Sequence, residues 1–388
     1  MKKKFILYTL LILALILFFQ NQLILSSNQS SDEKIESFSF FSIIGNKYIE
    51  QENYEKAIES FEIIIQENPE NPYAYYQIGC CKMKLDLYEE AAKYFEKVIS
   101  LDPDDALAYN NLGFCYSFLQ KHEESIKYLK RAIELDNNNV YAYGVLGSCY
   151  YFLENYSEAI KAYREYLNNN PNDVFMLNEL AECYIIVDSY LEAIDCIRDI
   201  LKLEPENFES YYDLGICYYN IEEYVKSIES LNQVIRIKPD YIKAYKLKSE
   251  IYLLLKRYSP AVDTCEEALK IVPKDLYLRL SLSDALIGRK SYYEAINVVM
   301  DAIKLDPNCA SAYEKWGRCS FLLEDYSTAK NLFKKAINID KKNARAHYLL
   351  GVCYLIEKNQ DLAVNEYKIL KEIDKELAEK LFELIFKK

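Results

Sequence analysis

Eleven cysteines and two histidines are the residues of this 388-residue chain that could bind a metal, form disulfides or catalyse a reaction. Zinc sites need ligands spaced about two to four residues apart, and the cysteines do not follow that spacing. Most of them recur instead at intervals of 34 residues or a multiple of 34. These are Cys81, Cys115, Cys149, Cys183, Cys217, Cys319 and Cys353. The spacing predicts a repeated packing position rather than a metal site.

The histidines, His122 and His347, are the remaining candidates for acid–base chemistry. Neither belongs to a recognisable set of nucleophile, base and orienting group. The sequence also holds no glycine-rich loop that would cradle a phosphate. It therefore predicts no catalytic residue, no cofactor and no metal ligand.

The composition bears on the fold and on the class of partner. The formal net charge is −13 at pH 7, and no block of basic residues follows Met1–Lys4. A surface of this sign repels phosphate backbones, so nucleic acid is not an expected partner. Apolar residues make up 51% of the chain, and only 9 glycines and 9 prolines occur, which favours a helical fold with a large core.

The N-terminal segment has the order of a membrane-directed sequence. Three lysines precede an apolar run, Phe5–Phe19, and three polar residues separate this run from a short apolar stretch that ends at Leu25. Counted as residues 5–25, it would form a signal-anchor helix of about 31 Å, long enough for a bilayer core. Counted as Phe5–Phe19, it is the core of a cleaved signal peptide. Both alternatives place the rest on the periplasmic or extracellular side, after a polar linker at residues 26–37.

Proline marks the period of the remaining chain. Seven prolines are separated by 34 residues or by twice 34, at Pro69, Pro103, Pro171, Pro205, Pro239, Pro273 and Pro307. Proline cannot continue a helix, so each marks a break after a helical unit. This phase sets ten repeats over residues 38–375. They begin at Phe38, Pro72, Ala106, Val140, Val174, Phe208, Ile242, Leu276, Ala310 and Ala344. Residues 376–388 follow as a capping helix.

Small and large side chains alternate at fixed positions within the repeat. Position 8 is glycine in seven repeats, Gly147 among them, and position 20 is alanine or serine in all ten. Small residues at both positions let two helices of a hairpin approach closely. Position 17 is tyrosine in eight repeats and position 4 is usually aromatic. His122 and His347 replace these aromatic residues, which favours a packing role for both.

The pattern resembles the tetratricopeptide repeat family, with its 34-residue period, aromatic at 4, glycine at 8, alanine at 20 and proline at 32. The third repeat shows it in Tyr109, Leu112, Gly113, Tyr116 and Ser125. The resemblance implies an all-α solenoid in which antiparallel helix pairs form a right-handed superhelix. It also implies that position 10, which holds the periodic cysteines, is small and buried. Neighbouring hairpins lie about 10 Å apart, too far for disulfides between these cysteines.

In the family the first helices line an inner groove, which positions 2, 5, 9, 12 and 13 face. Aromatic residues occupy positions 2, 9 and 13 in repeats two to five, at Tyr73, Phe114, Phe118, Tyr141, Phe152 and Phe175. Asn110 and Asn178, at position 5, could hydrogen-bond a peptide backbone. Two interpretations stay open: the rings grip a partner, or they pack between neighbouring first helices. Charges of the later repeats, such as Asp284 and Arg318, are expected to form a solvated face.

The resemblance implies a function in binding. We expect a membrane-tethered scaffold that holds a protein or an extended peptide in the groove. One subtype of the family clamps acidic C-termini with lysine and asparagine, but only Asn111 matches that set, so such a clamp is not expected. The alternative is a binder of a glycan or lipid-like polymer at the envelope. An enzyme is the least supported class, because no catalytic set is present.

Overall fold

The structure, a computed structural model, describes residues 35–386. Over this range the chain forms 21 α-helices and no strand, which confirms the all-α fold of paired helices. The expected apolar helix at 5–25 lies outside the described residues, as does most of the linker. Among helices of the described range, none combines the length and the apolar character that crossing a bilayer requires.

The chain divides into two units between Pro205 and Glu206, and the first unit contains five helix pairs. The first helices of these pairs are α2 (Ile35–Glu50), α4 (Pro72–Lys84), α6 (Ala106–Phe118), α8 (Val140–Phe152) and α10 (Val174–Ile186). The second helices are α3 (Tyr54–Glu67), α5 (Tyr88–Leu101), α7 (His122–Leu135), α9 (Tyr156–Asn169) and α11 (Tyr190–Leu203). From α4 onward, each first helix begins at the residue where the proline phase placed a repeat, whereas α2 begins earlier, at Ile35.

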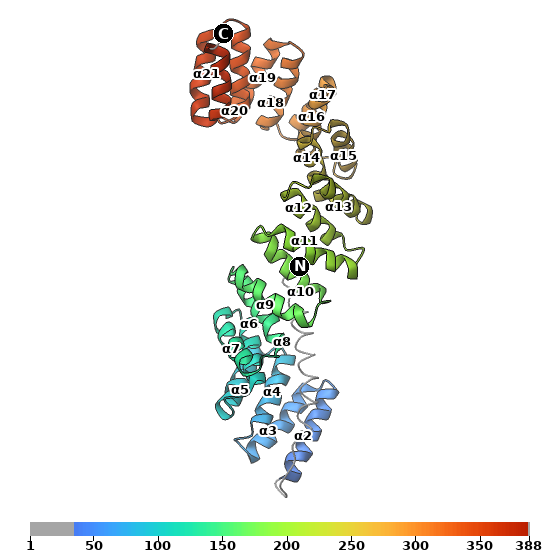
Figure 1. The fold of residues 1–388 in the computed structure, drawn as a ribbon, viewed down its shortest axis with the longest axis vertical. Helices are drawn as coiled ribbons and strands as arrows, with labels where there is room; N and C mark the ends of the chain where they lie inside the picture. Colours follow the sequence, from blue (N-terminus) through green and yellow to red (C-terminus); the bar gives the residue numbers. More distant parts are fainter. Residues whose placement is uncertain (1–34, 387–388) are drawn as a thin grey trace. The chain divides into compact units, whose positions relative to one another are not determined.

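The second unit contains five further pairs and a final helix. The first helices are α12 (Phe208–Asn220), α14 (Ile242–Leu254), α16 (Leu276–Gly288), α18 (Ala310–Leu322) and α20 (Ala344–Ile356). The second helices are α13 (Tyr224–Ile237), α15 (Tyr258–Ile271), α17 (Tyr292–Leu305), α19 (Tyr326–Ile339) and α21 (Gln360–Ile373), and α22 (Lys375–Phe386) follows. Within each unit, consecutive helices pack side by side as hairpins (Figure 1).

Asparagine or aspartate fixes the start of most first helices. One carboxylate oxygen of Asp105 accepts hydrogen bonds from the backbone N–H groups of Leu107 and Ala108, both at 2.9 Å. The same capping position is filled by Asn71, Asn139, Asp173, Asn207, Asp275 and Asn343. The first N–H groups of a helix have no partner within the helix, so each such cap stabilises it by about 1 kcal/mol.

The turn inside every hairpin has one residue in the left-handed conformation, and in none of the ten repeats is it glycine. In the fourth repeat this residue is Glu154, with φ of 57°. Its N–H donates to the carbonyl of Tyr151 at 3.0 Å, and Asn155 donates to the carbonyl of Tyr150 at 2.9 Å. These bonds satisfy the last carbonyls of α8, and they offset a conformational cost of roughly 1 kcal/mol.

Each hairpin is held together by a small residue that faces a large one. A Cβ atom added to Gly147 would lie 2.6 Å from Cδ1 of Tyr163, and one added to Gly317 would lie 2.5 Å from Cε1 of Phe333. Both rings have 0% exposure. Only a residue without a side chain therefore lets α8 approach α9, and α18 approach α19, as closely as observed.

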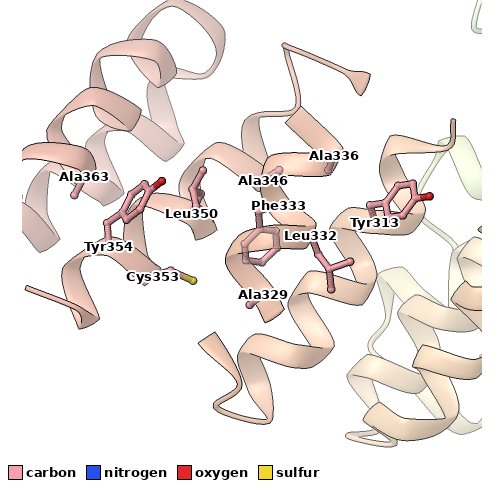
Figure 2. Close-up of a cluster of buried hydrophobic side chains, with 10 residues drawn as sticks. All are labelled: Tyr313, Ala329, Leu332, Phe333, Ala336, Ala346, Leu350, Cys353, Tyr354 and Ala363. Atoms are coloured by element: carbon pink, nitrogen blue, oxygen red, sulfur yellow. The ribbon is translucent and has the colours of Figure 1, made fainter. Parts of the chain in front are cut away.

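The apolar core continues from one hairpin into the next. Figure 2 shows a cluster of the second unit to which α18, α19, α20 and α21 all contribute. Phe333 projects from α19, Leu350 and Cys353 come from α20, and Ala363 comes from α21. No single hairpin encloses this cluster, so each repeat buries its apolar side against its neighbour.

Helix α22 closes the second unit. Leu381 is fully buried and lies 2.7 Å from the position of a Cβ atom added to Gly351, so it fills the place that a second-helix side chain takes in other repeats. Leu384 is 54% exposed. Phe382 and Phe386 are also exposed. The outer face of this cap is mixed rather than purely polar.

Candidate functional site

First helices of neighbouring hairpins contact one another in parts of both units. In the second unit α14 contacts α16, α16 contacts α18 and α18 contacts α20, while in the first unit α6 contacts α8. Between residues 35 and 386, second helices of neighbouring hairpins make no contact of this extent with one another. The first helices therefore lie closer together than the second helices. We call their solvent-facing side the first-helix surface. The sequence predicts that a partner binds there.

Two of the predicted site residues are buried. Phe114 is 2% exposed and Asn110 is 1% exposed, so neither offers surface to a partner. The side-chain amide of Asn110 donates to the side-chain oxygen of Asn111 at 3.4 Å. Tyr73 is half-buried, and its hydroxyl forms a hydrogen bond with Asn46 of the preceding repeat at 3.0 Å. Tyr73 thus links two neighbouring first helices, α2 and α4.

Phe118 and Phe152 stack on rings of the preceding repeat. The ring centroids of Tyr88 and Phe118 are 4.4 Å apart, and those of His122 and Phe152 are 4.9 Å apart. Each pair links position 17 of one repeat with position 13 of the next, and such a contact adds about 0.5–1.5 kcal/mol. Phe118 also contacts Phe114, at 4.7 Å between centroids. Phe152 keeps 43% exposure, so it both packs and faces solvent.

The remaining predicted residues lie further along the first unit. Tyr141 is half-buried and meets Tyr166 edge to face, with centroids 6.5 Å apart. Phe175 is half-buried. Asn178 is exposed, and its side-chain amide donates to the carbonyl of Val174 at 2.8 Å, within its own helix. The structure thus brings Phe114 and Phe118 together and leaves Phe152 and Asn178 as the more open members of the set.

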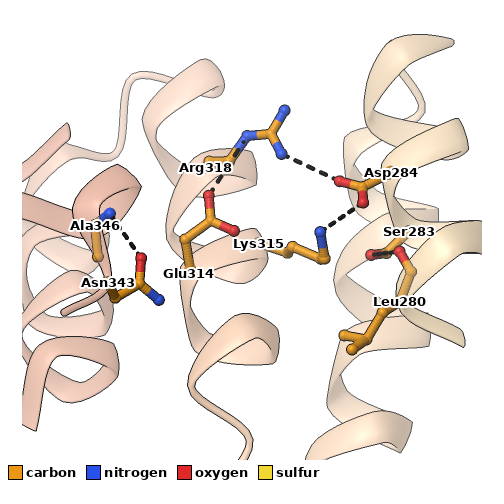
Figure 3. A network of polar contacts seen from close by, with 8 residues as sticks. All are labelled: Leu280, Ser283, Asp284, Glu314, Lys315, Arg318, Asn343 and Ala346. Carbon is orange, nitrogen blue, oxygen red and sulfur yellow. Dashed lines mark hydrogen bonds and ion pairs between the residues drawn. The ribbon is translucent and has the colours of Figure 1, made fainter. Parts of the chain in front are cut away.

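The sequence did not predict that charged side chains of the second unit form a largely buried cluster. Asp284 of α16 accepts hydrogen bonds from Lys315 at 2.6 Å and from Arg318 at 3.1 Å, both in α18 (Figure 3). Lys315 is 8% exposed and Glu314 beside it is 5% exposed. The expectation of a solvated face therefore does not hold for this cluster, which joins two first helices. Comparing position 9 of each repeat with position 6 of the next would have revealed the opposite charges.

Glu314 is the member of this cluster whose carboxylate is incompletely hydrogen-bonded. Burial raises the pKa of its carboxyl group, against the opposing charges of Lys315, Arg318 and Arg345. Its Oε1 has no hydrogen-bond partner and lies 3.8 Å from Nε of Arg318. An unsatisfied buried acceptor costs about 1–3 kcal/mol. Arg318 is itself only partly buried, so the cluster presents a guanidinium group to the first-helix surface.

The cysteines behave as packing residues. All eleven are unpaired, and the seven of the 34-residue series are buried. Burial raises the pKa of the Cys183 thiol to about 12 and that of Cys353 to about 11. Such thiols stay protonated at neutral pH and pack as small apolar groups. Among the described side chains, no three His, Cys, Asp or Glu residues gather as a metal site requires.

Comparison with known families follows the same period. Four family models, each described as a tetratricopeptide repeat, match residues 72–105, 104–172, 188–242 and 332–365. No curated protein sequence matches the chain.

Several solved structures are similar in fold. The C-terminal part of a TPR repeat-containing protein from Cytophaga hutchinsonii is 18% identical with a TM-score of 0.52, over 62% of this chain and 98% of that one. Naa15/Naa10 bound to HypK-THB is 14% identical with a TM-score of 0.50, over 89% of this chain and 65% of that one. YrrB, described as a TPR protein with an unusual peptide-binding site, is 24% identical with a TM-score of 0.45, over 48% of this chain and 96% of that one.

Proposed function

We propose that this chain, which belongs to the tetratricopeptide repeat family, is a scaffold. It holds a protein or an extended peptide on its first-helix surface. Stacked repeats of this kind create extended surfaces that proteins use for binding, and the family is typically non-catalytic. The proposal therefore concerns which part of that surface binds and what chemistry it accepts.

One observation carries the proposal: apolar side chains at position 13 are exposed on neighbouring first helices, on α8 and α10 in the first unit and on α18 and α20 in the second. In the first unit these are Phe152 at 43% and Ile186 at 42% exposure. In the second unit they are Leu322 at 44% and Ile356 at 44%, whereas Leu254, at 52%, is separated from Leu322 by Gly288 at position 13 of α16. Exposed apolar side chains at a regular interval favour a binding surface over chance exposure.

The interval sets the chemistry of the ligand. Neighbouring first helices lie about 10 Å apart. An extended chain advances about 3.3 Å per residue, so every third residue reaches the next position-13 side chain. Asn178 is exposed on the same helix as Ile186, and its side-chain oxygen can accept a hydrogen bond from the peptide backbone between these contacts. We infer an extended peptide with an apolar residue at every third position.

The membrane tether is the second part of the proposal, and the sequence alone supports it. Lys2–Lys4 followed by the apolar segment 5–25 directs the array to the non-cytoplasmic side. N-terminal sequencing of the mature protein tests this. An intact Met1 or Lys2 terminus supports the anchor, whereas a terminus near Ser27 or Ser30 supports a cleaved and secreted form.

The glycan alternative is not favoured by the geometry. Sugar rings bind aromatic side chains through an open ring face. Tyr88 covers Phe118, and His122 covers Phe152. Phe114 is buried altogether. Phe114 and one face each of Phe118 and Phe152 are therefore engaged within the protein.

A peptide array tests the binding surface. The full chain is applied to immobilised peptides in which apolar residues recur at intervals of two, three or four. We expect the interval of three to bind best. The double variant Phe152→Ser with Ile186→Ser should lose that binding, because both side chains are exposed on the first-helix surface of the first unit.

Leu191 supplies the matched control. It lies on the second helix α11 and is 66% exposed, more than either Phe152 or Ile186, so Leu191→Ser removes an exposed apolar side chain from another face. This variant should bind as the wild type does, and thermal unfolding of both variants establishes that they fold. Equal loss of binding in both variants, or none in the double variant, rules out the proposed surface.

A further inference from the structure

The first helix of the array exposes a face that every later repeat buries. In all nine later repeats the side chain at position 3 is at most 2% exposed, because the preceding hairpin covers it. In the first repeat this position is Phe40, which is 58% exposed. Ile43 beside it is 65% exposed. Position 10, which holds buried cysteine or another apolar residue elsewhere, is here Lys47, and it is exposed.

These side chains form one stripe on α2. Residues 40, 43 and 47 recur at i, i+3 and i+7, so Phe40, Ile43 and Lys47 lie on the same side of the helix. A terminal repeat normally shows a polar outer face, because no neighbour covers it. Position 3 is alanine in six of the later repeats, whereas the open end of the array carries phenylalanine. A large apolar residue at the one uncovered position indicates that something other than water covers it.

The chain length places a membrane within reach of this stripe. The apolar segment ends at Leu25 and α2 begins at Ile35, with nine residues between them. Nine residues span at most about 32 Å when fully extended. Phe40 lies only about 8 Å further along the helix. The stripe is therefore within reach of the surface of any bilayer that holds the apolar segment.

The charges of α2 fit the same arrangement. Lys47 can extend its ammonium group to anionic lipid headgroups while its stem lies over apolar surface. Glu50 is exposed one turn beyond Lys47, and an acidic side chain is disfavoured at such a surface. The first turns of α2 are therefore better suited to approach the bilayer than its last turn.

We propose that Phe40 and Ile43 insert into the interfacial region of the bilayer, with Lys47 at the headgroups, so that α2 docks the array onto the membrane. Amphipathic helices with large apolar residues bind interfaces in this way. This inference rests on the proposed membrane tether. It adds that the first repeat contacts the lipid instead of standing clear of it on the linker.

Quenching of a single tryptophan by brominated lipid tests the contact. The full chain carries Trp316→Phe, which removes its one native tryptophan, and either Phe40→Trp or Leu191→Trp. It is reconstituted into vesicles of phosphatidylcholine and phosphatidylglycerol with increasing brominated lipid. Leu191 is as exposed as Ile43 but lies four hairpins further along the first unit. We expect emission from Trp at position 40 to fall as brominated lipid increases, and emission from position 191 to stay constant.

Vesicle flotation separates this inference from the tether on which it rests. If the chain floats with vesicles but tryptophan at position 40 is not quenched, the docking is wrong and the tether stands. A second copy of α2, or the apolar segment folded back on it, would also leave this tryptophan unquenched and would overturn the proposal. If the chain does not float, tether and docking are both wrong. Lys47→Glu should weaken the quenching at position 40 without loss of flotation.

Discussion

At the scale of single residues, size complementarity between positions 8 and 24 decides how closely two helices pack. Glycine at position 8 faces a large side chain at position 24, as Gly147 faces Tyr163. Where position 8 is Ser283, position 24 is the smaller Val299. The sequence period predicts which positions are small, but the partner at position 24 follows only from the geometry of the hairpin. For the same reason, the period could not distinguish buried Phe114 from exposed Phe152.

Replacing Gly147 with alanine tests this complementarity. The new methyl group would approach Tyr163, which is fully buried and cannot move aside. We expect Gly147→Ala to lower the free energy of unfolding by about 2 kcal/mol, as overpacking of a core does. Urea unfolding measures the change. Adding Tyr163→Val recreates the proportions of Ser283 with Val299, so the double variant should be more stable than additive costs predict. Additive costs would contradict the pairing.

At the scale of elements, position 4 links several hairpins to the break before them. The hydroxyl of Tyr245 donates to the carbonyl of Pro239 at 3.1 Å, and Tyr313 donates to Pro307 at 3.3 Å. The proline that ends one repeat thus also offers a carbonyl to the next. The sequence predicts the spacing of the prolines and the aromatic residue at position 4. It does not predict the hydrogen bond from the tyrosine hydroxyl to the proline carbonyl, because that bond depends on the path of the loop between the helices.

His347 makes this bond in the tenth repeat and adds a second one. Its Nε2 lies 3.2 Å from the carbonyl oxygen of Lys341, and its Nδ1 lies 2.6 Å from a carboxylate oxygen of Glu366 in α21. Both neighbours accept hydrogen bonds, so only the doubly protonated ring donates to both. Burial lowers the pKa of His347, but the bond to Glu366 and its charge, with the Lys341 carbonyl, raise the pKa above its ordinary value.

We expect the last repeat to become less stable as pH rises. A raised folded-state pKa gives stability that is full below about pH 6.5, the value in the unfolded chain, and is lost as pH rises through the folded value. Hydrogen exchange of α20, α21 and α22, corrected for the intrinsic rate, measures this loss. In His347→Tyr the bond to Lys341 should persist, as in Tyr313, and the pH dependence should be weaker. Equal pH dependence in variant and wild type would contradict the assignment.

At the scale of the whole molecule, both units bury thiols at the same repeat position, and every repeat after the first carries at least one cysteine. The array and its period could be predicted from the sequence. The division between Pro205 and Glu206 could not, because Pro205 follows the same 34-residue phase as Pro171 and Pro239. Local patterns record how each repeat is built, whereas a boundary between units depends on how well neighbouring repeats pack.

Thiol reactivity measures this packing along the chain. Eight of the eleven cysteines are buried, and Cys80, Cys196 and Cys309 are half-buried. Burial raises the pKa of Cys80 to about 12 and that of Cys196 to about 11, so little of either is present as the reactive thiolate at neutral pH. We expect one fast-reacting thiol with a thiolate-specific reagent in the native protein, and all eleven after unfolding in urea. Cys309→Ser should remove the fast phase, whereas Cys80→Ser should leave it.

Because each buried thiol reacts only when its repeat opens, the slow phases then report the stability of successive hairpins. Rapid reaction of more than the three half-buried thiols would show that the hairpins do not stack as closely as the structure describes.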